Sequence, residues 1–231
     1  MVGRDPDGSE RAVEFERLVG ERRSIRGFLP QEIPLALLQR VLQVAQQAPS
    51  NCNVQPWVVH VVTGDATRRM RAALLDAVRT EEPLSPDIVL TPPYPDAYRA
   101  RQISAAKALF TASGVRREDV EARRLSFERN FHFFDAPCAA FFFLPDWAGM
   151  REAADCGMYV QTLMLAFVAH GLASCPQGAL SHYAGVVRRE LKVPEQLRLL
   201  FGLSFGYEDP SAPANQTRTG RASLSESVAI H

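Results

Sequence analysis

The sequence predicts a fold of the α/β or α+β class, in which a few strands are enclosed by helices. Short runs of β-branched and aromatic residues alternate with longer stretches whose apolar residues recur at helical spacing. Hydrophobic residues make up 46% of the 231 residues, which is enough for a substantial core. The length fits one large domain over residues 1–231 or two small ones, and the chain has no internal repeat and no low-complexity tract.

In the N-terminal half, we expect two helices separated by an arginine-rich turn. Pro34 falls in the first turn of the second helix, where its missing N–H costs little, and Pro49 ends that helix. A valine-rich strand follows, and Asp65 caps a third helix. The predicted helices cover residues 9–20, 32–48 and 66–80, and the predicted strand covers residues 57–63.

The middle of the chain changes character, because five prolines interrupt residues 81–101. Two amphipathic helices follow, near residues 99–112 and 116–131. Long irregular segments in compact domains often act as lids, so we expect residues 81–131 to form a lid or excursion.

The C-terminal half is predicted to supply the centre of the core. Residues 150–170 form a helix that is apolar on too many sides to lie on the surface of a monomer. A polar tail over residues 208–231 ends the chain. The other predicted elements are strands over residues 137–144, 173–175 and 197–207 and a helix over residues 181–191.

Charge and cysteine content exclude several classes of protein. The 26 basic and 26 acidic residues cancel, whereas a dedicated nucleic-acid binder needs a basic excess. No apolar stretch reaches the roughly 20 residues of a membrane span, and residues 1–10 have no apolar core of signal-peptide length. The four cysteines form no C-x-x-C pair, so neither a disulfide framework nor a metal site is expected. We therefore expect a cytoplasmic protein without a membrane or nucleic-acid partner.

The common catalytic motifs are absent, and four polar loops remain as candidate ligand sites. Residues 22–26 hold three arginines and a serine, which suit phosphate, although a solvated basic turn has the same composition. Residues 49–57 gather amides that can bond a heterocycle edge, or that cap their own loop. Residues 174–178 offer backbone N–H groups before a helix, and their Cys175 is more typical of a buried thiol than of a nucleophile. Residues 218–221, taken alone, are typical of a flexible terminus.

Together these loops resemble one known family. The run Arg22-Arg23-Ser24-Ile25-Arg26-Gly27-Phe28, with Ala48-Pro49-Ser50 and Asn53-Val54-Gln55-Pro56-Trp57, is similar to the FMN-dependent, oxygen-insensitive nitroreductases. The resemblance continues through the long apolar helix and residues 175–178 to Arg221, and so covers most of the chain. It implies an α+β sandwich, with a mainly antiparallel central sheet flanked by helices. It also implies an intertwined homodimer with FMN at the interface.

The resemblance further implies roles toward FMN. Arg22, Ser24 and Arg221 match the phosphate contacts, with Arg23 near the ribityl chain and phosphate. Arg26 matches a basic residue near flavin N1 and O2, where a cation stabilises the charge of the reduced flavin. The other implied contacts are Pro49 and Ser50 from the partner chain, Asn51 in the same loop, Asn53 and Gln55 at the pyrimidine edge, Pro176 against the ring, and the backbone N–H groups of Gln177 and Gly178 at N5 and O4.

The activity that the resemblance implies is ping-pong hydride transfer. NAD(P)H reduces flavin N5 and leaves, and a nitroaromatic compound or a quinone then enters the same cleft as the oxidant. Because protons can come from solvent and the flavin performs the reaction, no side chain is assigned as a catalytic acid or base.

Two features depart from the family pattern. Cys52, beside Asn51, stands where small residues are common, so its thiol could tune the flavin edge. The excursion is long, and its aromatic and cationic side chains are predicted to cover the flavin and to favour an acidic aromatic substrate. The alternative is that the arginines lie on the surface of an ordinary helix. The residues concerned are Tyr94, Tyr98, Arg99, Arg101, Phe131 and Phe134.

Two other functions remain compatible with the sequence. One is a different enzyme on the same flavin scaffold, such as a reductive dehalogenase, an azoline oxidase or a flavin-consuming enzyme, because a fold does not fix a reaction. The other is a protein that binds FMN without turnover. The basic, aromatic excursion favours a small aromatic oxidant over these alternatives.

Overall fold

The computed structural model describes residues 9–89 and 92–231, and its centre is a four-stranded antiparallel sheet. The expectations for residues 1–8 and for residues 90–91 of the excursion lie outside the described residues. The strand order is β1-β2-β4-β3, with β1 at Val58–Thr63, β2 at Cys138–Pro145, β3 at Ala173–Gln177 and β4 at Leu197–Gly206. This sheet and its helices confirm the expected α+β class.

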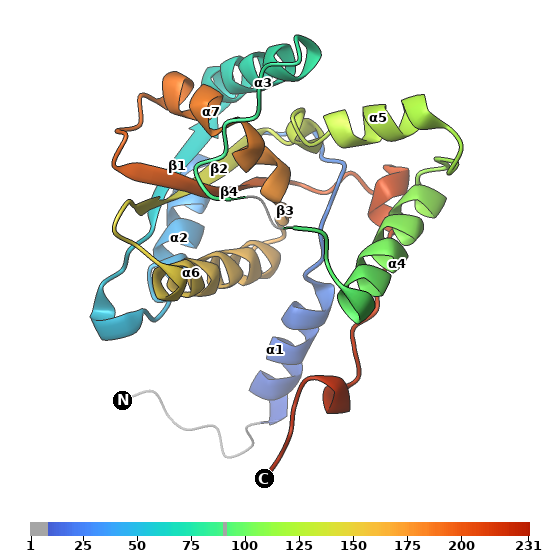
Figure 1. The fold of residues 1–231 in the computed structure, drawn as a ribbon. Coiled ribbons are helices and arrows are strands. Elements are labelled where there is room, and N and C mark those ends of the chain that lie inside the picture. The colour runs from blue at the N-terminus through green and yellow to red at the C-terminus, as the bar shows by residue number, and fades with distance from the viewer. Residues whose placement is uncertain (1–8, 90–91) are drawn as a thin grey trace.

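Strand β2 is the most buried strand, because helices cover both of its faces. Phe141 and Phe143 point to one face and belong to the same cluster as residues of α3 (Gly64–Arg79) and α7 (Ala184–Leu191). Phe142 points to the other face, toward α2 (Leu35–Ala45) and α6 (Met150–Ala169). The period of two along the strand thus explains the three layers that Figure 1 shows.

The remaining helices lie at the periphery of this three-layer body. Helix α1 (Ser9–Glu21) and helix α4 (Asp96–Ala112) bury no residue, and α4 and α5 (Val120–Glu128) stand to one side of the sheet (Figure 1). Short 3-10 turns connect the larger elements: η1 at Asn51–Asn53, η2 at Phe133–Asp135, η3 at Gly178–Tyr183, η4 at Pro213–Gln216 and η5 at Leu224–Glu226.

Several predicted element ends were wrong, each for a local reason. Pro34 precedes the second helix as its N-cap, so that helix is shorter than predicted. Thr63, not Asp65, is the N-cap of α3, because Gly64 adopts a φ of +52° and turns the chain directly from strand into helix. Strand β3 extends through Pro176 to Gln177, where a turn was expected. Proline is tolerated there because β3 is an edge strand.

The excursion is also shorter than predicted, because its first residues pack onto the body. Asp87 Oδ2 accepts hydrogen bonds from Arg188 Nη2 at 2.6 Å and from the backbone N–H of Leu199 at 2.7 Å. The segment that projects therefore begins after this anchor. Within residues 9–89 and 92–231, no helix has the length and apolar character needed to cross a bilayer.

Candidate functional site

The segment after α1 runs as an extended chain beside the edge strand β3. Ser24 forms a parallel bridge with Ser174, and the N–H of Ile25 donates to the Ser174 carbonyl at 3.0 Å. Because side chains alternate along an extended chain, Ile25 enters the core while Arg22, Ser24 and Arg26 lie on the other side. Arg221 of the tail approaches Arg22. We call Arg22, Ser24, Arg26 and Arg221 the arginine cluster.

The arginine cluster concentrates positive charge with no carboxylate between its members. Arg22 is half-buried, and none of the ion pairs or side-chain hydrogen bonds among the described residues involves its guanidinium. Burial, and then the neighbouring Arg221 cation, lower the pKa of Arg22, yet a guanidinium stays protonated near neutral pH. Within the described part of the chain, the Arg221 guanidinium hydrogen-bonds its own turn alone, through the carbonyls of Thr219 and Gly220 and the Thr219 hydroxyl. A half-buried guanidinium beside an exposed one suits a phosphate, whose oxygens match guanidinium donors.

Cys175 lies at the centre of the arginine cluster and is fully buried. Arg26, the Ser24 hydroxyl and Arg22 all favour its thiolate, but burial is the largest influence and raises the pKa of Cys175 to about 11. The thiol is therefore protonated at neutral pH, as expected for a structural cysteine.

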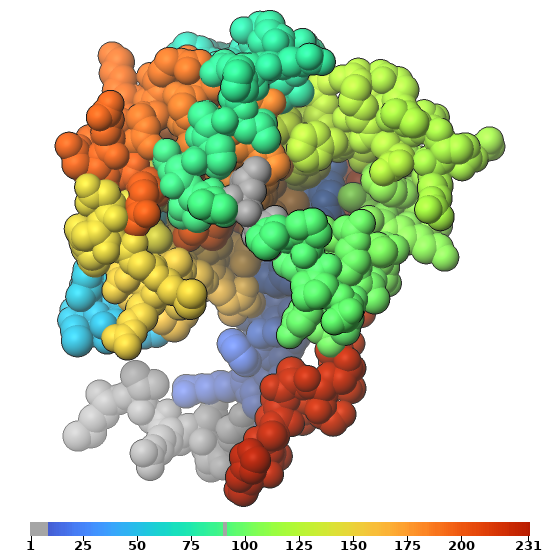
Figure 2. Space-filling model, in the orientation of Figure 1, coloured from blue at the N-terminus to red at the C-terminus, as the bar shows by residue number. Residues whose placement is uncertain are grey.

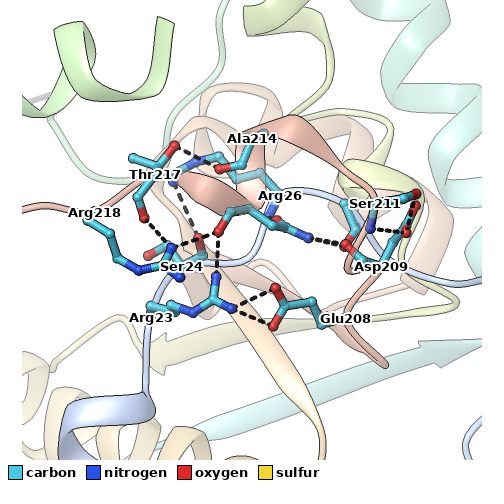
Figure 3. Close-up of polar contacts among 11 residues, drawn as sticks. Arg23, Ser24, Arg26, Glu208, Asp209, Ser211, Ala214, Thr217 and Arg218 are labelled. Atoms are coloured by element: carbon cyan, nitrogen blue, oxygen red, sulfur yellow. Dashed lines mark hydrogen bonds and ion pairs between the residues drawn. The ribbon is translucent and has the colours of Figure 1, made fainter. Parts of the chain in front are cut away.

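Arg23 turns away from the arginine cluster and binds the tail. Its Nη2 donates to both carboxylate oxygens of Glu208, at 2.7 and 2.8 Å, and its Nη1 donates to the Asn215 carbonyl at 2.6 Å (Figure 3). Most of its donors are thus used within the protein. The contact to the ribityl chain that the resemblance implied for Arg23 would therefore have to use the N–H donors of Arg23 that bond neither Glu208 nor Asn215.

Residues 49–57, which we call the amide loop, have a strained backbone at three positions, and residues 51–55 are exposed whereas Pro56 and Trp57 are buried. Cys52, Asn53 and Gln55 have φ values of 48°, 57° and 50°, at a cost of roughly 1–2 kcal/mol for each non-glycine residue. The N–H of Asn51 donates to Asp155 Oδ2 of α6 at 3.1 Å, and the N–H of Gln55 donates to Ser50 Oγ at 2.9 Å. The amides of Asn51, Asn53 and Gln55 are exposed and available to a ligand.

The arginine cluster and the amide loop lie at opposite ends of α6 (Figure 1). The amide loop is anchored at Asp155, in the second turn of the helix, whereas Ser24 pairs with Ser174, just beyond its last turn. Fourteen residues separate Asp155 from the helix end at Ala169, which is roughly 20 Å at 1.5 Å per residue. The two groups of predicted contacts are therefore not brought together within one chain.

The end of β3 presents an open edge beside the arginine cluster. Pro176 and Gly178 are exposed, and a Cβ built on Gly178 would meet nothing within 4 Å. Gln177 is buried instead: its Nε2 donates to the carbonyl of Asn130 at 2.9 Å, and its Oε1 accepts from Ser204. Because Pro176 and Gly178 leave this strand end open beside the arginine cluster, a flat heterocycle can lie against it while its phosphate binds the arginines. The residues present therefore fit FMN.

The predicted lid residues divide between surface and core. Tyr94 and Tyr98 are exposed, and the Arg101 guanidinium lies 5.5 Å from the Tyr98 ring while pairing with Glu226 Oε2 at 2.9 Å. Arg99 is also exposed and bonds Gln102. Phe131 is fully buried and packs edge-to-face on Tyr183, so it belongs to the core and to no surface that a substrate reaches.

A cavity lies between α4, α5 and the tail. It measures about 830 Å³, and its walls include Arg26, Phe134 and Arg129. Figure 2 shows the hollow between α4 (green) and α5 (yellow-green), with the blue N-terminal segment at its back. Phe134, unlike Phe131, therefore contacts accessible space.

Sequence reasoning missed three polar residues that hold the two halves of the site. Glu208 and Asn215 are single polar residues in a polar tail and fit no motif. Asp155 could have been found, because it is an acid in the second turn of a largely apolar helix and is only 5% exposed.

Known proteins resemble this chain over most of its length. The model of the nitroreductase family matches residues 19–207. The nitroreductase NfnB of Mycolicibacterium smegmatis is 42% identical over 94% of this chain and 92% of its own length. The chloronitrobenzene nitroreductase of Comamonas testosteroni is 37% identical over 92% of this chain and 94% of its own. The crystal structure of the FMN-dependent nitroreductase NfnB from Mycobacterium smegmatis in complex with NADPH superposes with a TM-score of 0.92. It is 39% identical and covers 97% of this chain and 100% of that one.

The chain belongs to the nitroreductase family. The resemblance seen in the sequence is thus confirmed, and so is the nitroreductase-like fold.

Proposed function

We propose that this chain is an FMN-dependent NAD(P)H oxidoreductase that reduces nitroaromatic compounds and quinones as a cytoplasmic homodimer. The observation that carries this proposal is the arginine cluster, in which Arg22 and Arg221 face each other without a counter-ion among the described residues. The names of the relatives support the reaction, since NfnB is described as FMN-dependent and the Comamonas testosteroni relative as a chloronitrobenzene nitroreductase.

Each part of the site has a separate task in this proposal. Arg22, Ser24 and Arg221 bind the phosphate of FMN, and the exposed edge at Pro176 and Gly178 receives the ring. Arg26 supplies a fixed cation beside the pyrimidine part of the ring. FMN, when bound, supplies the two-electron redox chemistry that links NAD(P)H to the nitro compound.

The arginine cluster and the amide loop, which we call the two half-sites, lie far apart within one chain, and this separation supports a site that two copies share in a dimer. The amide loop of one copy would complete the arginine cluster of the other, because the two lie at opposite ends of α6 within one chain. Apolar side chains that a partner could cover are present on α1 and α6, where Val13, Phe15 and Met158 are 64%, 59% and 41% exposed.

The reaction is tested by the visible spectrum of the purified protein. We expect flavin absorption bands that bleach with NADPH under anaerobic conditions and return when nitrobenzene is added. Bands that bleach and do not return would favour another flavin enzyme of the same scaffold. A colourless protein that takes up no added FMN would refute the cofactor and the site.

The shared site is tested by mixing two defective variants, Arg22→Ala and Asn53→Ala, by co-expression. If FMN bridges two copies, each hybrid dimer has one intact site and one doubly altered site, so about a quarter of all sites recover wild-type affinity in a random mixture. If both groups act within one chain, every site carries one defect and nothing recovers. Each variant expressed alone is the control.

We further propose that the projecting segment around α4 selects the substrate. Tyr94, Tyr98 and Phe134 offer aromatic contacts, and Arg99 and Arg101 offer charge to an acidic nitroaromatic compound. The Arg99→Ala and Arg101→Ala variants should lose kcat/KM for 4-nitrobenzoate and keep it for nitrobenzene. An unchanged preference in both variants would end this part of the proposal.

A further inference from the structure

Asn215 occupies a buried position where the tail meets residues 22–28, which we call the arginine segment. It lies in η4, and only 1% of the residue is exposed. Its Oδ1 accepts from the backbone N–H of Arg26 at 2.7 Å, and its Nδ2 donates to the carbonyls of Gly27 and Asp209, each at 2.8 Å. One acceptor and both donors of the side chain are therefore used, which fixes the orientation of the amide.

The backbone of Asn215 collects further contacts from arginine. Its carbonyl accepts from Arg23 Nη1 at 2.6 Å and from Arg218 Nη1 at 2.9 Å. Figure 3 shows Arg23 and Arg218 approaching the turn that carries Ala214 and Thr217. One residue thus joins the backbone of Arg26 to the start of the tail that carries Arg221.

Gly27 makes this junction possible. A Cβ at Gly27 would lie 2.3 Å from the Cβ of Ala212, which is closer than real Cβ atoms come. Only glycine allows the tail to close onto the arginine segment, and Asn215 then bonds across the contact.

We propose that Asn215 is a positioning residue for the cofactor, which holds Arg26 and the Arg218–Arg221 segment in register around the bound FMN. This inference rests on the proposed function. Asn215 lies beyond residues 19–207, the part of the chain that the family model matches. Its effect is indirect, because the side chain contacts the backbone N–H of Arg26, whereas the Arg26 guanidinium donates to the Ser24 carbonyl.

The test compares Asn215→Ala with the matched control Thr217→Val. Thr217 Oγ1 donates to the Ala214 carbonyl at 2.7 Å, so the control removes a hydrogen bond from the same turn without touching Arg23 or Arg26. Asn215→Ala should weaken the binding of oxidised FMN by roughly tenfold, and Thr217→Val by less than about twofold.

A second measurement separates positioning from a loss of structure. Reduced FMN carries more negative charge than oxidised FMN, so misplacing Arg26 weakens the reduced form more. The midpoint potential of FMN bound to Asn215→Ala should therefore shift to a more negative value than in the wild type and in Thr217→Val. Equal weakening of both forms, or a variant that behaves like Thr217→Val, would overturn the proposal.

The variant Asn215→Asp gives a readout that remains if the alanine variant fails to fold. A carboxylate keeps the acceptor for Arg26 but faces two carbonyls without a donor, whereas the protonated acid can donate to one of them. The affinity of this variant for FMN should rise as the pH falls, because burial and the two facing carbonyls favour the protonated acid. Arg23 and Arg218, which bond the backbone carbonyl of the same residue, oppose this effect and set how far the pH must fall. No recovery would contradict the proposal. A wild-type protein that binds no FMN would refute the proposed function as well, whereas the results above refute only the role of Asn215.

Discussion

The arginine cluster and the amide loop present polar groups to a ligand in opposite ways. The arginine cluster is an extended segment fixed by backbone bonds to β3 and by the tail, and its charges lie close together and partly desolvated. The amide loop is exposed, has three residues at positive φ, and is held to the body through Asp155. This difference indicates that the arginine cluster is preformed for an anion. In the amide loop, by contrast, Asp155 and the buried Trp57, which packs on Tyr159, hold the two ends of an exposed and strained segment.

The largest effect should come from Arg22→Ala, because Arg22 is the desolvated cation of the preformed half. We expect the affinity for FMN to fall by about 10- to 100-fold, or roughly 1.4–2.8 kcal/mol, while the affinity for riboflavin, which lacks the phosphate, stays the same. Fluorescence titration of the apoprotein with both flavins measures this. Arg40→Ala, an exposed arginine of α2, is the control. A variant whose preference for FMN over riboflavin is unchanged would show that the phosphate binds elsewhere.

A smaller effect is expected from Asp155→Ala, which removes the anchor of the amide loop. The N–H of Asn51 loses its acceptor, and the strained loop can relax. Because the loop is proposed to contact the ring, the affinities for FMN and riboflavin should fall together, each by about three- to tenfold. Asp155→Asn keeps an acceptor oxygen and should lose less. A change in selectivity between the two flavins would contradict the division into two half-sites.

The smallest effect concerns the cysteines, one of which lies in each half-site. Cys52 is exposed in the amide loop, whereas Cys138, Cys156 and Cys175 are buried, which raises their pKa values to about 11, 12 and 11. A raised pKa leaves little thiolate near pH 8, so a thiol reagent should label one cysteine per chain rapidly. Cys52→Ser should abolish this fast phase, and FMN should slow it. Fast labelling in the Cys52→Ser protein would contradict the assignment.

The sequence predicted those parts of the fold and site whose signals are local. The run of apolar residues around Phe141 predicted β2. The composition of residues 22–26 predicted a phosphate-type site, but the segment was expected to be a turn and is an extended chain beside β3. The ion-pair partner of Arg23 could not be predicted from local sequence, because Glu208 lies 185 residues further on. The role of Asn215 could not be predicted for the same reason, because it depends on hydrogen bonds to Arg26 and Gly27, which come close only in the folded chain.

The contact between the tail and the arginine segment determines where the polypeptide can be truncated without loss of the site. A truncation designed from the matched residues 19–207 would end the polypeptide just before Glu208. It would keep every strand, yet expose the Arg23 guanidinium and leave the N–H of Arg26 and the carbonyl of Gly27 without their acceptor and donor. The minimal folding unit and the minimal working unit of this protein are thus expected to have different C-terminal boundaries.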